Sequence, residues 1–339
     1  MGEEDVGEAV IPGTLVSAFW NADSDRLRLP WRLLGGGIVF VVLGIVVSLS
    51  FQALLAVFGI GALATSLVGS VDTLSISLTG VASSTGLTVV GVYLAGRLLD
   101  RRWFTDFGLH LDRSWAADFG FGAALGAALM TGIFLVELAA GWARVTGTLR
   151  TSGSASLWVA LAGAVVLFVA VSVGEELLLR GYLLTNLAEG FRGLGPTVAV
   201  VVATLLSSGV FGLLHAGNPN ATVVSTTNVA LAGVVLAAGY VLTGELGIPM
   251  GFHLTWNFFQ GPVYGFPVSG TSPGVAVVAV AERGPDRWTG GAFGPEAGLL
   301  GVAALAVGLV AIAAWVRHRS GEVVLSPVVW TPDLRNEEE

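Results

Sequence analysis

The segment Gly174-Glu175-Glu176-Leu177-Leu178-Leu179-Arg180 places two adjacent carboxylates and a guanidinium inside one of the most apolar parts of the chain. Charges in such a setting are costly, and in membrane segments they usually face a protein interior and serve a function. In a helix, Glu176 and Arg180 are four residues apart and share a face, whereas Glu175 lies about 100° away around the axis. We therefore expect Glu176 to pair with Arg180 and Glu175 to point at another group.

The composition around this segment indicates a membrane protein. The chain has 339 residues, of which 54% are hydrophobic and only 12% are charged, and its mean hydropathy is +0.79. Soluble domains carry about twice that share of charged residues. The sequence therefore predicts an all-α fold, a polytopic transmembrane helix bundle. Because there is no cysteine, disulfides and thiolate metal sites are excluded.

The charged residues are unusual in kind. All 16 basic residues are arginine, and with 24 acidic residues the formal net charge is −8. This lysine-free, acidic composition suggests a halophile with a salt-rich cytosol, and it gives no support to nucleic-acid binding. The acidic residues at the N-terminus lack the basic region of a cleaved signal peptide.

Hydrophobic stretches of membrane-crossing length predict about eight spans. They cover about residues 33–63, 79–98, 116–140, 156–189, 196–215, 222–242, 248–262 and 297–316. The expected organisation is a polar N-terminal segment (1–30), a single transmembrane domain (31–318) with its core at about 155–262, and an acidic C-terminal tail (319–339). In the third span, Gly122 and Gly126 have the small-xxx-small spacing that permits close helix packing.

Eight spans place both termini on one side of the cell membrane. Arginine clusters at 26–32, 97–102 and 317–319 mark that side as cytoplasmic. A Gly/Pro-rich loop, 264–296, precedes the last span and is expected to be either a lid or a variable connection.

Two further apolar segments carry polar groups that suit catalysis. Glu175 lies 19 residues before the turn at Leu194 and His215 lies 21 after it, so antiparallel helices bring them to about the same depth. Phe211 precedes His215 by one helical turn and is placed to pack on its ring. In the seventh span, His253 and Asn257 are four residues apart and project from one face.

These residues are suited to hydrolysis. A carboxylate beside a neutral imidazole activates water, and a second imidazole with an amide donates hydrogen bonds to the oxyanion that forms. Glu175, His215 and His253 are alternatively a zinc ligand set with water in the fourth position. No serine in a nucleophile-elbow context and no cysteine is present, which argues against an acyl-enzyme.

Each residue also has an ordinary structural interpretation, such as an interhelical hydrogen bond for a single histidine or asparagine. Two other functions stay open for the set as a whole. One is a membrane transporter or channel that relays protons or ions through the buried Glu and His residues, although no internal repeat is evident. The other is a catalytically silent membrane scaffold or immunity protein, against which the intact motifs argue.

Three motifs in this order resemble the signatures of the CPBP family, which comprises CAAX prenyl endopeptidases and bacteriocin-processing enzymes and is also called the Abi family of intramembrane proteases. They are Glu175-Glu176-x-x-x-Arg180, Phe211-x-x-x-His215 and His253-x-x-x-Asn257. The resemblance covers about residues 155–262. It implies an eight-helix endopeptidase that cleaves a membrane-associated peptide or protein at the lipid bilayer, with CAAX-type and leader-peptide processing both open.

The resemblance also implies roles for individual residues. Glu175 is the catalytic carboxylate and His215 its partner in activating water, while His253 and Asn257 stabilise the oxyanion. Glu176 and Arg180 support the structure or hold the substrate. Family members are commonly labelled metalloproteases, and a metal-free, glutamate-dependent mechanism has also been proposed. We favour the latter, with no required cofactor, because Asn257 is a poor zinc ligand and a good hydrogen-bond donor; Zn²⁺ is the alternative.

Overall fold

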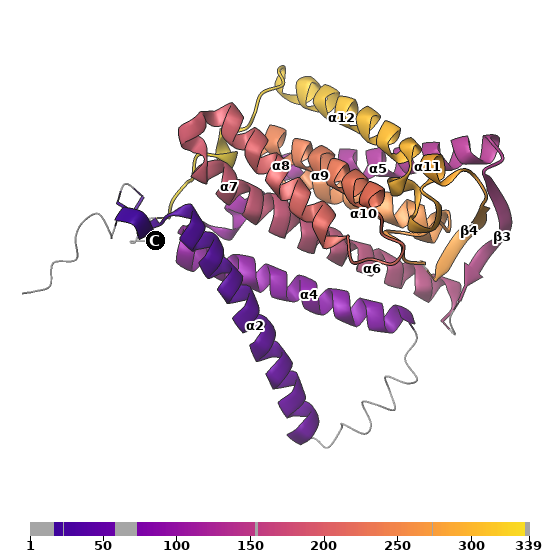
Figure 1. Ribbon diagram of the computed structural model, residues 1–339, viewed down its shortest axis with the longest axis horizontal. Coiled ribbons are helices and arrows are strands. Elements are labelled where there is room, and N and C mark those ends of the chain that lie inside the picture. Colours follow the sequence, from indigo (N-terminus) through magenta and orange to yellow (C-terminus); the bar gives the residue numbers. More distant parts are fainter. Residues whose placement is uncertain (1–16, 23, 58–72, 153–154, 273, 336–339) are drawn as a thin grey trace, which may run out of the picture.

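The computed structural model describes residues 17–22, 24–57, 73–152, 155–272 and 274–335. Most of the expected acidic N-terminal segment, part of the first span with the link after it, and the last tail residues lie outside this described part. Helices predominate, and all the long ones except α2, which slants away, pack into one elongated bundle (Figure 1), which confirms the all-α class. The α-helices are α2 (Leu29–Val57), α4 (Thr73–Ala95), α5 (Arg113–Ala139), α6 (Leu157–Glu176), α7 (Thr185–Gly190), α8 (Pro196–Leu214), α9 (Val223–Thr243), α10 (Gly247–Phe258), α11 (Asp286–Thr289) and α12 (Leu299–Ser320).

Shorter elements complete the chain. The π-helices are η1 (Gly96–Asp100), η3 (Leu177–Leu184) and η5 (Phe259–Val263). The 3₁₀ turns are η2 (Phe104–Phe107), η4 (Arg192–Leu194), η6 (Gly291–Phe293), η7 (Pro295–Ala297) and η8 (Pro327–Val329). The strands are β1 (Trp20–Asn21), β2 (Arg26–Leu27), β3 (Ala143–Thr151) and β4 (Val275–Glu282). The expected loop at 264–296 is therefore largely structured, since it contains β4, α11 and two 3₁₀ turns.

Seven segments of the described chain are long and apolar enough to cross a membrane, which marks an integral membrane protein. The count differs from the expected eight because the expected span at 248–262 is α10, a helix of only 12 residues. Its π-helical continuation η5 adds five more residues. Together α10 and η5 make the eighth pass through the bundle. They are surrounded by other parts of the protein, whereas an ordinary span is apolar and long enough to cross the membrane by itself.

The passes run between two ends of the bundle. At the end that we call the turn end, which holds η4, the N–H of Leu246 donates to Gly108 O at 2.9 Å and Arg319 donates to Ser114 Oγ at 2.6 Å. The opposite end is the sheet end, where β3 and β4 pair as an antiparallel ladder. Both ends of the described chain lie at the turn end, where Arg335 N donates to Arg101 O at 2.8 Å (Figure 1).

Buried ion pairs fasten the turn end. Glu189 of α7 accepts hydrogen bonds from Arg26, from Arg32 at 3.1 Å and from Arg102 at 3.0 Å. Asp100 pairs with Arg32 at 3.3 Å. These contacts join the start of α2 and the end of the α4–η1 segment to α7, so that the two N-terminal helices are anchored where they meet the rest of the bundle.

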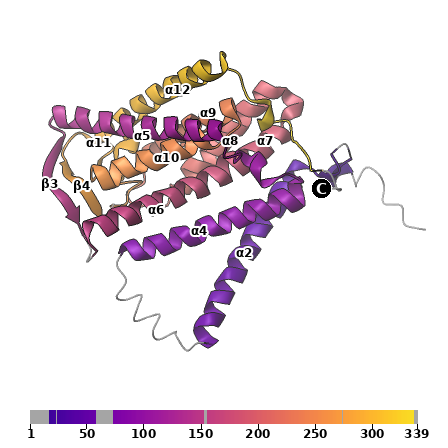
Figure 2. The ribbon, with the colours of Figure 1, turned by 180° about the vertical axis from the view of Figure 1, so that it is seen from behind.

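The most extensive helix contact is between α5 and α10, which run side by side (Figure 2). A Cβ atom on Gly122 would lie 2.3 Å from Ile248 O, and one on Gly126 would lie 2.5 Å from Phe252 O. The small-xxx-small interpretation of these glycines is thus confirmed. Because α10 carries His253 and Asn257, the two glycines set the depth at which these side chains enter the bundle.

We predict that Gly122→Ala destabilises the protein, since the added methyl group has no room and overpacking costs about 1–3 kcal/mol. Gly120→Ala is the matched control on the same helix, because a Cβ there meets nothing within 4 Å. That control is expected to be neutral or slightly stabilising, since alanine favours a helix over glycine by about 1 kcal/mol. Thermal unfolding of the purified variants in detergent measures the difference. Equal unfolding temperatures for the two variants would contradict the close contact.

Candidate active site

The carboxylate pair lies where α6 changes its helical geometry. Glu175 and Glu176 are the last two residues of α6, and the π-helix η3 begins at the next residue. Ser207 of α8 donates to the carbonyl of Leu179 at 2.7 Å, which gives the widened helix an external partner. Short π-helical segments inside α-helices are frequent at functional sites. Here the change of pitch follows directly after the two carboxylates.

The fully buried carboxylate of Glu176 contacts both the guanidinium of Arg180 and the imidazole of His253. Its Oε1 accepts from Arg180 at 2.7 Å and lies 2.8 Å from His253 Nδ1. Arg180, also fully buried, donates to Gly233 O at 3.2 Å. The expected pairing of Glu176 with Arg180 is therefore present, but the contact with His253 was not anticipated. Since an ionised carboxylate only accepts, His253 Nδ1 carries the hydrogen and Nε2 is free to face another group.

Glu175 points at that free nitrogen. Its Oε2 lies 3.9 Å from His253 Nε2, is buried, and has no hydrogen-bond partner. This distance is too long for a direct hydrogen bond. From the sequence, His215 is the expected partner of Glu175. The structure instead brings His253 against Glu175, and no ion pair joins Glu175 to His215 among the residues it describes.

Phe211 packs among the charged and imidazole side chains. The Arg180 guanidinium lies 4.5 Å from the centre of its ring, and the rings of His215 and His253 contact it edge-on at 4.8 and 5.9 Å. His215 Nδ1 lies 2.8 Å from the carbonyl oxygen of Phe211. Because a carbonyl only accepts, Nδ1 of neutral His215 carries the hydrogen, and its Nε2 lone pair is available to accept a proton.

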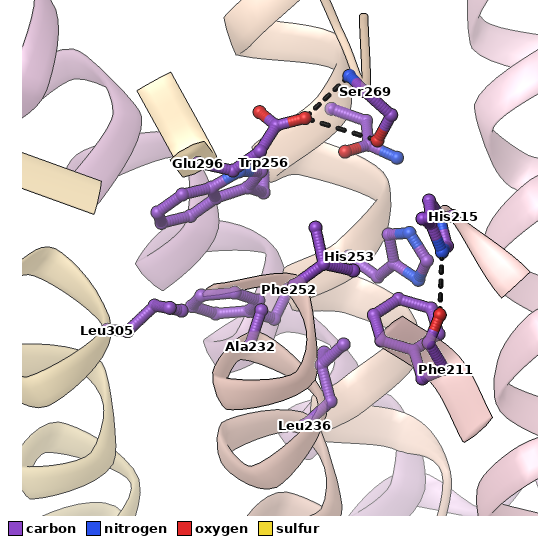
Figure 3. Close-up of a pocket in the computed structure, with 12 residues that line it drawn as sticks. Phe211, His215, Ala232, Leu236, Phe252, His253, Trp256, Ser269, Glu296 and Leu305 are labelled. Carbon is purple, nitrogen blue, oxygen red and sulfur yellow. Dashed lines mark hydrogen bonds between the residues drawn. The ribbon is translucent and has the colours of Figure 1, made fainter. Parts of the chain in front are cut away.

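The two histidines and Asn257 line one pocket with about 420 Å³ of empty space, part of it open to solvent (Figure 3). The full lining is Phe211, His215, Val229, Ala232, Leu236, Phe252, His253, Trp256, Asn257, Ser269, Glu296 and Leu305. Its polar side chains lie on one side and its aliphatic side chains form a floor opposite them. His215, Asn257 and Ser269 are partly exposed, whereas His253 is buried.

The wall formed by the 264–296 segment contributes a carboxyl group that the sequence analysis missed. Glu296 Oε1 accepts from the Ser269 hydroxyl at 3.1 Å and from its backbone N–H, and Oε2 accepts from Gln260. Burial raises the pKa of Glu296 from 4.5 to about 7. No sequence signal identifies this residue, because it reaches the pocket only through the folding of the 264–296 segment.

The proposed zinc ligands do not fit a metal ion in this arrangement. Among the described residues, no group of three or more His, Cys, Asp or Glu side chains could hold one. Glu175 Oε2 lies 3.9 Å from His253 Nε2, and no ion pair brings Glu175 to His215 among the described residues. We therefore derive no step through a metal.

Comparison with known proteins supports the resemblance noted in the sequence. Residues 155–259 match a family model described as type II CAAX prenyl endopeptidase Rce1-like. The matched segment contains all three motifs, from Glu175 to Asn257. No curated protein and no solved structure matched the chain. The match confirms the resemblance to the CPBP intramembrane proteases and supports, at the level of the family, a membrane protease of the CAAX type.

Replacing Arg180 is expected to destabilise the protein. Arg180→Ala leaves the buried Glu176 carboxylate without its cation, and breaking a buried pair in this way costs about 3–5 kcal/mol. Arg317→Ala, at an exposed arginine near the end of α12, is the control and should change stability by less than about 0.5 kcal/mol. Unfolding in detergent measures both. A variant Arg180→Ala that is inactive yet as stable as the unsubstituted protein would show that Arg180 acts on substrate instead.

The buried Glu296 carboxyl predicts a pH dependence of stability. Its folded pKa of about 7 exceeds the unfolded value of 4.5, so its contribution is present in full below pH 4.5 and is lost as pH rises through about 7. The loss amounts to about 3 kcal/mol. Glu296→Gln keeps the shape without the titration, so its unfolding temperature should fall less than that of the wild type between pH 4.5 and 8. Equal slopes for the two proteins would contradict this assignment.

Proposed function

We propose, on the premise that residues 155–259 form an Rce1-like domain of the CPBP intramembrane protease family, that the protein is an endopeptidase that hydrolyses a peptide bond of a membrane-associated substrate. The observation that carries the proposal is the placement of His253. One of its nitrogens is held by the Arg180–Glu176 pair, and the other faces the unpartnered oxygen of Glu175. Such a group of buried titratable residues beside a pocket is typical of a catalytic centre.

Glu175 is the general base of this mechanism. A water held at its free Oε2 adds to the carbonyl carbon of the scissile bond, and the carboxylate takes the proton. The neutral tautomer of His215 favours the same step, since its Nε2 lone pair faces away from the Phe211 carbonyl and is free to accept a hydrogen bond from water. The proton then passes to the amine when the carbon–nitrogen bond breaks.

His253 and Asn257 stabilise the negative charge that develops on the carbonyl oxygen. Both line the pocket and lie one helical turn apart on α10. The amide of Asn257 donates to this oxygen, and the ring of His253 lies at the adjacent position. Glu176 and Arg180 do not touch the substrate in this scheme. They fix the orientation of the His253 ring and are positioning residues.

The pocket also indicates the kind of chain that is cut. Its floor is formed by aliphatic and aromatic side chains, with Leu236, Phe252 and Leu305 among them. An apolar side chain of the substrate fits this floor, while the peptide bond meets the polar side. We propose an extended segment with an apolar residue near the cleavage site, presented by a substrate that is itself attached to the membrane.

Replacing the proposed base tests the function without knowledge of the substrate. We expect Glu175→Gln to abolish hydrolysis and to leave the fold intact, since the two side chains are nearly isosteric. Peptide termini are compared in membranes from cells that produce the wild type or the variant at matched levels. Termini that appear only with the wild type are the predicted result.

Glu137→Gln is the matched control, because Glu137 is a fully buried carboxyl group of another membrane-spanning helix and has no hydrogen-bond partner for either side-chain oxygen. It should yield the wild-type termini. If the wild type and a well-folded Glu175→Gln gave identical termini, proteolysis by this site would be ruled out, and ion flux would be the next property to measure.

A further inference from the structure

Two carbonyl groups of η3 accept hydrogen bonds from side-chain hydroxyls. The hydroxyl of Ser207, on α8, donates to the Leu179 carbonyl at 2.7 Å. The hydroxyl of Thr185 donates to the Arg180 carbonyl at 3.4 Å and lies 2.7 Å from the hydroxyl of Tyr240, on α9. These two carbonyls belong to the peptide groups on either side of the Arg180 Cα atom. The backbone that carries Arg180 is therefore held from both neighbouring helices, α8 and α9.

The three hydroxyl groups belong to fully buried residues, Ser207, Thr185 and Tyr240. In the absence of water, a carbonyl that loses its donor is left unsatisfied, and a fully paired polar network makes the surrounding structure rigid. The Arg180 side chain is fixed as well, because it donates to Glu176 at 2.7 Å and to the Gly233 carbonyl at 3.2 Å. Both the backbone and the guanidinium of this residue thus have one defined position.

From these contacts we infer that Ser207 and Thr185 are positioning residues of the proposed reaction. Arg180 pairs with Glu176, and Glu176 contacts the ring of His253, so a shift of the η3 backbone is passed on to a ring that lines the pocket. Misplacing a reacting group by about 1 Å costs up to about 100-fold in rate. Neither hydroxyl belongs to the pocket lining, so both act on the chemical step and not on substrate binding. This role rests on the proposed function.

Two neighbouring serines of α8 provide a matched pair of variants. Ser207→Ala removes the donor to Leu179, whereas Ser208→Ala removes a buried hydroxyl that has no hydrogen-bond partner in the described part of the chain. Alanine keeps the Cβ atom of Ser208 that lies against Gly233. The full-length proteins are assayed in detergent with a synthetic peptide that spans a Glu175-dependent cleavage site. We expect kcat to fall about tenfold or more in Ser207→Ala with KM unchanged, and neither constant to change in Ser208→Ala.

Hydrogen exchange follows η3 without any substrate. We expect the backbone amides of residues 177–185 to exchange faster in Ser207→Ala than in Ser208→Ala, because only the first variant frees a carbonyl of this helix. Equal exchange in the two variants would overturn the inference. Equal kcat values, or a rise in KM alone, would overturn it while leaving the protease intact. If no cleavage depends on Glu175, the proposed function fails, and hydrogen exchange still decides whether the hydroxyl holds η3.

A second pair of variants decides the question if Ser207→Ala does not fold. Thr185→Val removes the hydroxyl at nearly constant shape and leaves both Arg180 O and the Tyr240 hydroxyl without this partner. Thr185→Ser keeps the hydroxyl. We expect kcat to fall in Thr185→Val and to return toward the wild-type value in Thr185→Ser, with KM constant throughout. Equal kcat values for the valine and serine variants would contradict the positioning role.

Discussion

The buried ion pair between Arg180 and Glu176 is the interaction on which the site depends. Two adjacent carboxylates within an apolar helix are stable only if at least one has a partner, because an unpaired charge there is costly. Arg180 supplies that partner and is itself held by the Gly233 carbonyl and by the ring of Phe211. Glu176 then has a second lone pair for His253. The pair thus stabilises the buried Glu176 carboxylate and at the same time fixes the orientation of the His253 ring. Oε2 of Glu175 has no hydrogen-bond partner and is left for the reaction.

The remainder of the bundle brings α10 to this pair. A 12-residue helix is too short to cross a bilayer alone, and α10 is stable at its position because it lies against the glycine face of α5 and continues into η5. The segment after η5 then returns as β4, α11 and η7 and completes the pocket with Ser269 and Glu296. Contacts that look purely structural, such as Gly122 against Ile248, therefore control the distance between His253 and the carboxylates. Substitutions there are expected to affect stability and catalysis together.

Sequence reasoning identified the membrane bundle, the Glu176–Arg180 pair and the face shared by His253 and Asn257, since hydropathy and four-residue spacing report these directly. It did not anticipate that His253, on α10, lies next to Glu175, because the equal depth on two antiparallel helices pointed to His215. The eighth pass was expected as an ordinary span, whereas its length is sufficient only within the bundle. Glu296 could not be identified from the sequence, because only tertiary packing brings it to the pocket. Adaptation to high salt stays a prediction from composition.

The central claim is that Glu176 acts through His253 and not on the substrate. A double-mutant cycle of cleavage rate, with Glu176→Gln, His253→Gln and the double variant, tests it most directly on a substrate identified from the Glu175-dependent termini. The account predicts that Glu176→Gln slows cleavage in the wild-type background and has no further effect once His253 is replaced. If the two losses multiplied in the double variant, Glu176 would have a role of its own in the reaction, and the assignment of the Arg180–Glu176 pair to positioning would be wrong.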